Sequence, residues 1–146
     1  MAWGFGGVGY GRHRVAKMLS DPDAAERLRV AAVSVNSEGA LSAYRRMSTP
    51  ANRIKFLGPS FATKFLTFCS ADSDRPALIF DRLIASWLTK HVGGRWGATT
   101  WNTPAYGRYL DLVYAWASQI DARPDEIERL MFSDEASLLG NQWATE

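Results

Sequence analysis

A lysine and an aspartate near the middle of the chain have the types and the spacing for amine chemistry. Gly58-Pro59 breaks the chain just before the lysine, Lys64. Three phenylalanines then recur with the spacing of one helix face, at Phe61, Phe65 and Phe68. At about 100° per residue, Lys64 borders this apolar face, where loss of hydration favours a neutral, nucleophilic amine. Lys64 is therefore a candidate nucleophile, and the competing interpretation is a lysine that extends to solvent from the rim of a buried face.

The aspartate, Asp81, follows a short apolar run at 77–80 and precedes an apolar-rich segment at 82–88. We expect the run to be an extended arm that packs and positions the carboxylate. Asp81 itself stands where the N-cap of the next helix belongs. A capping carboxylate is held rigidly, so it can also stabilise positive charge at a neighbouring site.

This combination resembles the core of the helix-hairpin-helix DNA glycosylases, and within them the 8-oxoguanine glycosylases that use a lysine. Their hairpin reads Leu-Pro-Gly-Val-Gly-Thr-Lys, and the frame that starts at Gly58 matches it at Pro59, Thr63 and Lys64. The chain departs from the family at Ser60 and Ala62, which replace the two hairpin glycines. It also has 80–83 as Phe-Asp-Arg-Leu where the family has Val-Asp-x-His. By helix order the resemblance spans roughly residues 3–132, with specific motifs only within 53–88.

The resemblance implies a DNA glycosylase that removes an oxidised purine such as 8-oxoguanine. Lys64 would form a Schiff base with the sugar and support AP lyase activity, while Asp81 stabilises the charge on the sugar. Phe68 lies where the 8-oxoguanine enzymes place a cysteine against the extruded base, and a core phenylalanine is the competing interpretation. Trp116 is a candidate for the far wall of the base pocket. The implied partner is double-stranded DNA with a damaged base, bound by a monomer, and no cofactor or metal is implied.

Basic residues flank these motifs and are candidate phosphate contacts. Arg12 and Arg14 follow a glycine-rich segment, and Arg45, Arg46, Arg53 and Lys55 lie on the approach to the hairpin. The resemblance adds the hairpin positions Gly58, Ser60 and Ala62. An ordinary solvated face is the alternative for the basic cluster.

Length and composition limit the class of protein. The chain has 146 residues, 47% of them hydrophobic, and a formal charge of +2, which fits one packed domain over 1–146. A single cysteine gives no disulfide framework or cysteine-rich metal signature, and no long apolar run or signal pattern is present. We therefore expect a soluble, cytoplasmic protein that does not enter a membrane. Compared with larger members of the family that it resembles, this chain would lack their N-terminal elements.

Helical periodicity without alternating strand patterns predicts an all-α domain of about seven helices that contains a helix-hairpin-helix motif. Capping and breaking residues place helices at 12–19, 22–35, 40–47, 60–68, 81–90, 104–120 and 124–132, followed by a weakly patterned tail.

Two other functions remain open from the sequence. One is a helix-hairpin-helix module that binds DNA without catalysis. The other is a glycosylase-like component of a bacterial antiphage defence system. Trapping with borohydride separates the first from an enzyme, because only a Schiff-base former becomes linked to DNA.

Overall fold

The computed structural model describes residues 10–138, and within this range the chain is entirely helical, as predicted. Its helices are α1 (Tyr10–Leu19), α2 (Ala24–Ser37), α3 (Ala40–Ser48), α4 (Pro59–Cys69), α5 (Arg82–His91), α6 (Thr103–Ile120) and α7 (Pro124–Leu138). This part of the chain has seven helices and no strand, which confirms the expected class and number. No helix in the same range combines the length and apolar character that a membrane crossing needs.

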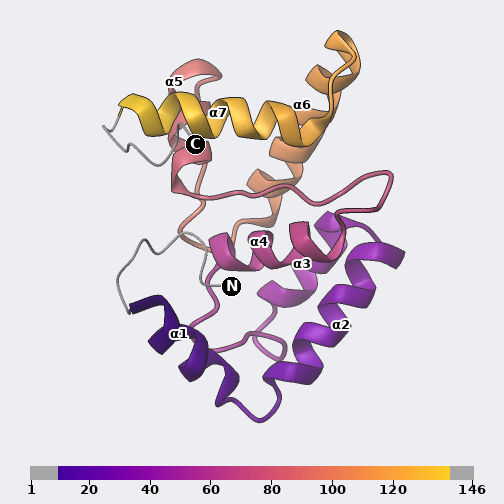
Figure 1. Cartoon of the computed structure of the whole chain (residues 1–146), viewed down its shortest axis with the longest axis vertical. Coiled ribbons are helices and arrows are strands. Elements are labelled where there is room, and N and C mark those ends of the chain that lie inside the picture. The colour runs from indigo at the N-terminus through magenta and orange to yellow at the C-terminus, as the bar shows by residue number, and fades with distance from the viewer. Residues whose placement is uncertain (1–9, 139–146) are drawn as a thin grey trace.

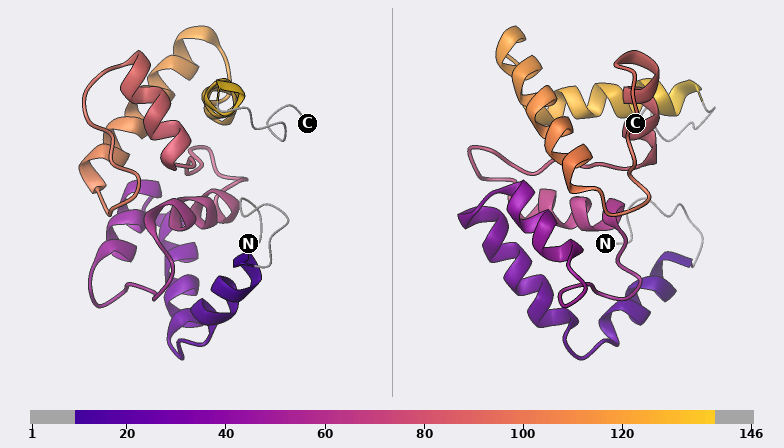
Figure 2. Two further views of the ribbon diagram at one scale, coloured as in Figure 1. Left: turned by 90° about the vertical axis from the view of Figure 1, so that its left-hand side faces the viewer. Right: turned by 180° about the vertical axis from the view of Figure 1, so that it is seen from behind.

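The helices form two groups (Figure 1). Helices α1 to α4 occupy the lower part of the view, and α5 to α7 the upper part, while the segment 70–81 crosses from one group to the other. Figure 2 shows the same arrangement from two further sides. Helix α3 packs against both α4 and α6, and α7 packs against both α5 and α6. The core is one cluster that includes Tyr44, Leu66, Phe80 and Met131 from both groups.

Local sequence signals account for the helix boundaries that place the candidate residues. Helix α4 begins at Pro59, whose missing N–H costs nothing in a first turn, and Gly58 precedes it as the N-cap. At α6, the Asn102 side chain accepts a hydrogen bond from the Ala105 amide at 3.1 Å. Asp121 closes α6 with a left-handed backbone, at φ 52°.

Helix α7 is longer than predicted, because it continues to Leu138 where the sequence indicated a tail after 132. Contacts with α5 explain the extension. Glu135 is buried and accepts hydrogen bonds from Lys90 Nζ and Ser86 Oγ, both at 2.6 Å. The Asp134 carboxylate accepts another from Trp87 Nε1 at 2.7 Å. These polar contacts hold the last turns of α7 although their apolar pattern is weak.

The loop 49–58 joins α3 to α4 and contains a backbone outlier. Phe56 has φ 68°, a left-handed conformation that a bulky side chain rarely adopts, and its ring is 40% exposed. The ammonium groups of Lys17 and Lys55 lie 5.5 and 5.4 Å from the centre of this ring. The helix-hairpin-helix assignment of this region stays a prediction.

Candidate active site

Lys64 and Asp81 meet, as their positions in the sequence predicted. Lys64 Nζ lies 3.3 Å from Asp81 Oδ2, and the two side chains are 14% and 12% exposed. The lysine comes from the middle of α4 and the aspartate from the start of α5. The pair is therefore an ion pair largely removed from solvent, where charge interactions are stronger than at an open surface.

The two oxygens of the Asp81 carboxylate have different partners. Oδ1 accepts hydrogen bonds from the Leu83 and Ile84 amides at 3.0 and 3.3 Å, so Asp81 is the N-cap of α5. Oδ2 is the oxygen that faces Lys64. Because the cap holds Oδ1 in place, it also fixes the direction in which Oδ2 points. Asp81 is thus the helix N-cap that the sequence predicted.

The Lys64 amine also lies over an aromatic ring. Its Nζ is 5.4 Å from the centre of the Phe61 ring, one turn earlier on α4. A ring face attracts a cation, so this contact favours one position of the long side chain. Thr63 and Leu66 anchor the same part of α4 in the core with no exposed surface.

The residues 76–80, which we name the arm, bring Asp81 to this position. The arm is extended, and side chains from the surrounding helices bind its backbone groups. Ser70 Oγ accepts a hydrogen bond from the Ala77 amide at 2.8 Å, and Thr63 Oγ1 accepts one from the Phe80 amide at 3.0 Å. Both acceptors belong to α4 or its C-cap, so α4 carries the lysine and also holds the arm that leads to the aspartate.

Helices α6 and α7 hold the arm from its other sides. The hydroxyl groups of Tyr114 and Tyr106 donate hydrogen bonds to the carbonyl oxygens of Pro76 and Leu78. Glu128 of α7 accepts a short hydrogen bond of 2.6 Å from the Ile79 amide. A buried segment without a paired strand needs such partners, because an unpaired buried amide or carbonyl is costly.

A comparison with known protein families decides the assignment. A sequence model of the family described as "Putative 8-oxoguanine DNA glycosylase OGG-like protein" matches residues 1–132. The chain belongs to this family. Membership supports a DNA glycosylase-like function and implies DNA binding. No curated protein and no solved structure matches the chain.

The two residues predicted for the base pocket of this OGG-like protein lie in different surroundings. Phe68 is 66% exposed, so the alternative interpretation as a core phenylalanine is wrong. It lies one turn after Lys64 on α4, where its ring is open to solvent.

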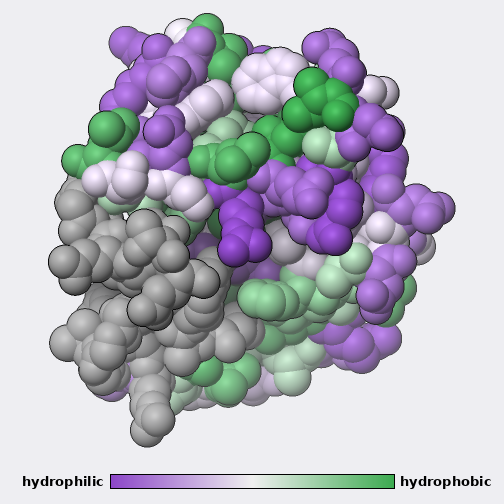
Figure 3. All heavy atoms as spheres, turned by 45° about the horizontal axis from the view of Figure 1, so that its top comes forward, coloured by the Kyte–Doolittle hydropathy of each residue, from purple (hydrophilic) through white to green (hydrophobic). Residues whose placement is uncertain are grey.

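Trp116 instead lines a cavity of about 450 Å³ between α5, α6 and α7, together with Trp87, Ile127 and Met131. Neither Lys64 nor Asp81 lines that cavity. Figure 3 turns the upper part of the molecule forward and shows apolar side chains exposed there among polar ones.

The basic residues predicted to bind DNA differ in their surroundings. Arg45 and Lys55 are exposed. Arg46 pairs with Glu38 at 2.9 Å, and Arg53 donates from Nε to the Ser48 carbonyl at 2.8 Å. The side chains of Arg12 and Arg14 lie outside the described residues.

At the hairpin positions, Gly58 caps α4, and the Ser60 hydroxyl donates to the Ala98 carbonyl at 3.1 Å. Ala62 has no exposed surface. These contacts join the start of α4 to the loop between α5 and α6, which carries Ala98.

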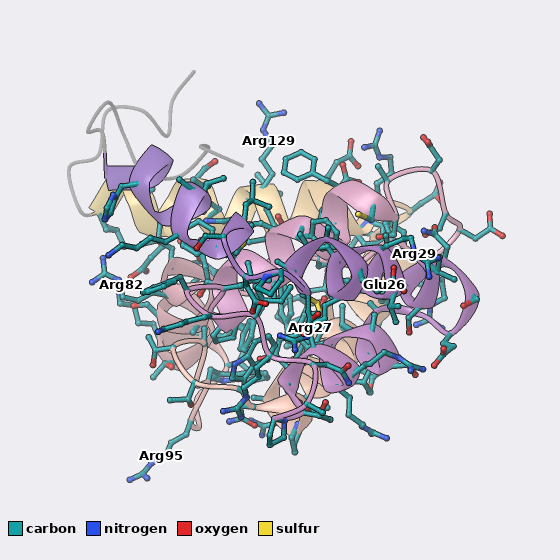
Figure 4. The ribbon with its side chains drawn as sticks, turned by 90° about the horizontal axis from the view of Figure 1, so that it is seen from below. Glu26, Arg27, Arg29, Arg82, Arg95 and Arg129 are labelled. Carbon is teal, nitrogen blue, oxygen red and sulfur yellow. The ribbon has the colours of Figure 1, made fainter. Side chains whose placement is uncertain are left out.

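Some exposed arginines near these elements were missed by the sequence reasoning. Arg82 directly follows Asp81 and is exposed, and it extends from the surface in Figure 4, as do Arg95 and Arg129. The adjacency of Arg82 to Asp81 was a signal that could have identified it. Among residues 10–138, no three His, Cys, Asp or Glu side chains gather as a metal site would require.

Proposed function

We propose that this protein is a DNA glycosylase that removes an oxidised purine such as 8-oxoguanine and has AP lyase activity through a Schiff base. The main support for this proposal is the largely buried ion pair of Lys64 and Asp81, in a chain that belongs to the OGG-like family. A reactive amine beside a rigid carboxylate is the pairing that this chemistry requires.

In the proposed reaction the damaged nucleotide first leaves the base stack, which costs a few kcal/mol. Lys64 Nζ must lose a proton before it attacks, and Asp81 Oδ2 lies 3.3 Å away as an acceptor. A bond forms between Nζ and the sugar C1′ as the bond from C1′ to the base breaks. Asp81, ionised again once the proton has passed to the departing base, stabilises the positive charge on the sugar. The sugar ring then opens as the C1′–O4′ bond breaks and O4′ takes the proton that Nζ releases, which leaves an imine between Nζ and C1′. Loss of a proton from C2′ of this imine expels the 3′ phosphate.

For binding, we propose that the chain acts as a single domain over 1–146 and as a monomer on duplex DNA. The exposed Arg45, Arg53 and Lys55 are the proposed phosphate contacts, with Arg12, Arg14 and Arg46 as further candidates. The exposed Phe68 ring, one turn from Lys64, offers a surface on which an extruded purine can stack. Trp116 is less well supported as a pocket wall, because its cavity lies elsewhere.

Borohydride trapping on duplex DNA that contains 8-oxoguanine tests this proposal. The wild type should become covalently linked, and Lys64→Gln should not. The chain has three other lysines, at 17, 55 and 90, so Lys17→Gln is a matched control that should still crosslink. Asp81→Asn keeps an oxygen for the helix cap but loses the charge, so it should stay folded while excision slows by orders of magnitude.

The outcomes separate the alternatives. A wild type that binds duplex DNA but neither excises a base nor crosslinks would be a non-catalytic binding module. Excision that persists in Lys64→Gln would show that Lys64 is not the required nucleophile. Circular dichroism of each variant checks that the fold is retained.

A further inference from the structure

Glu128 is a half-buried acid beside the candidate active site that the proposed reaction does not use. It lies on α7 and accepts the 2.6 Å hydrogen bond from the Ile79 amide. Ile79 is two residues before Asp81, so this bond connects the last helix to the chain segment that carries the carboxylate. Most other contacts to the arm come from neutral hydroxyl groups, whereas this one comes from an ionisable group.

The surroundings of Glu128 favour its neutral form. Burial raises the pKa of its carboxyl to about 8, although the hydrogen bond from the Ile79 amide opposes the shift. The charges of Asp81 and Asp125 raise the pKa further, and that of Lys64 lowers it. The facing titratable groups on α6 are the hydroxyls of Tyr106 and Tyr109.

A second buried polar group lies in the same cluster. The Tyr109 hydroxyl is completely buried and has no hydrogen-bond partner among residues 10–138, and the charges of Glu128 and Asp81 both act on it. Buried polar groups without partners are uncommon and often occur near functional sites. The Glu128 carboxyl and the Tyr109 hydroxyl are therefore two polar groups from α7 and α6 that lie close enough to Asp81 for their charges to interact.

We propose that Glu128 is a positioning residue for the Lys64–Asp81 pair: its side chain holds the arm through the Ile79 amide and, while protonated, places no second negative charge beside Lys64. The inference rests on the proposed function. When Glu128 ionises, its negative charge attracts Lys64 and repels Asp81, which disturbs the pair and slows the proposed attack.

Two variants separate the hydrogen bond from the charge. Glu128→Gln keeps an oxygen for the Ile79 amide and cannot ionise. Glu128→Ala removes the acceptor and leaves that amide unpaired. At neutral pH we expect Glu128→Gln to crosslink at nearly the wild-type rate, and Glu128→Ala to lose about 10- to 100-fold because Asp81 is displaced.

The pH profile provides the readout that a merely structural role would not change. Single-turnover trapping rates are measured from about pH 6 to 9.5 for the wild type and for Glu128→Gln. The ratio of the variant rate to the wild-type rate should be flat at low pH and rise as pH passes about 8. A ratio that stays flat throughout, or equal rates for the Gln and Ala variants, would overturn the proposal. If Glu128→Ala does not fold, the Gln profile decides alone.

A measurement without DNA keeps this inference distinct from the proposed function. The Ile79 amide signal in a ¹⁵N-correlated spectrum should titrate with a midpoint near 8 in the wild type and should not titrate in Glu128→Gln. If no crosslink forms at any pH but the Ile79 signal titrates, the glycosylase proposal fails and Glu128 still controls the arm. If the Ile79 amide signal does not titrate, the proposed positioning role of Glu128 is wrong, whether or not the protein excises a base.

Discussion

At the scale of single residues, Thr63 links the two halves of the candidate site. Its hydroxyl donates to the Ser60 carbonyl and accepts the Phe80 amide, each at 3.0 Å, and the side chain has no exposed surface. Thr63 directly precedes Lys64, and Phe80 directly precedes Asp81. One hydroxyl therefore connects the residues next to both members of the ion pair.

We expect Thr63→Val, which has nearly the same shape, to lower the free energy of unfolding by about 1–3 kcal/mol because the Phe80 amide stays buried without a partner. Thr67→Val is the matched control, since the Thr67 hydroxyl only donates to the Thr63 carbonyl within α4, at 2.9 Å. Urea denaturation of both variants measures the difference. Equal losses would show that the Phe80 contact contributes little.

Local sequence patterns singled out Lys64 and Asp81 as candidates but gave no sign of Glu128, the acid that lies near them. The periodicity of α4 and the capping pattern of α5 are local signals, and both candidates follow from them. The contact between Glu128 and Ile79 joins positions 49 apart in the chain, which no local pattern specifies. The same limit explains Phe68: an apolar residue at helical spacing suggests a core position, but only the packed helices show that most of its side chain stays exposed.

At the scale of elements, the loop before α4 stores backbone strain at Phe56. A left-handed backbone costs an ordinary L-residue about 1–2 kcal/mol, and glycine avoids this cost. We therefore expect Phe56→Gly to be more stable than Phe56→Ala by about 1 kcal/mol, because both lose the ring and only glycine relieves φ 68°. Thermal unfolding measures both variants.

The comparison of two variants is needed because the ring has contacts of its own with Lys17 and Lys55. The difference in stability between the wild type and either variant includes the loss of those contacts. The difference between Phe56→Gly and Phe56→Ala reports only the cost of the backbone conformation. An alanine variant as stable as the glycine variant would mean that the loop relaxes to another conformation.

Helix positions were more predictable than helix ends. Gly58-Pro59 and the cap at Asp81 fixed the starts of α4 and α5 to within one or two residues. The end of α7 could not be predicted, because Asp134 and Glu135 are held by side chains of α5. Such polar contacts between helices leave no apolar period in the sequence.

At the scale of the whole molecule, a net charge of +2 is small, so DNA binding must depend on where the charges lie. We expect affinity for duplex DNA to fall steeply with salt. Arg45→Gln and Lys55→Gln should each reduce the slope of log affinity against log salt by about one. Fluorescence anisotropy at several salt concentrations measures these slopes.

Arg29→Gln is the control for this experiment. Arg29 on α2 is held by Glu26 through hydrogen bonds of 2.8 and 2.7 Å, so its charge is already balanced. Figure 4 shows both residues next to each other on α2. If Arg29→Gln changes the slope as much as the other two variants, the DNA-binding face has been assigned to the wrong side.

The arm has a consequence for when the protein becomes reactive. Its partners are Thr63 and Ser70 at α4, Tyr106 and Tyr114 on α6, and Glu128 on α7. A growing chain that has left the ribosome only as far as α5 contains the lysine and the aspartate but lacks three of these five partners. We therefore expect the Lys64–Asp81 pair to assemble only after α6 and α7 have been made, so that a partly made chain would lack the proposed reactive site.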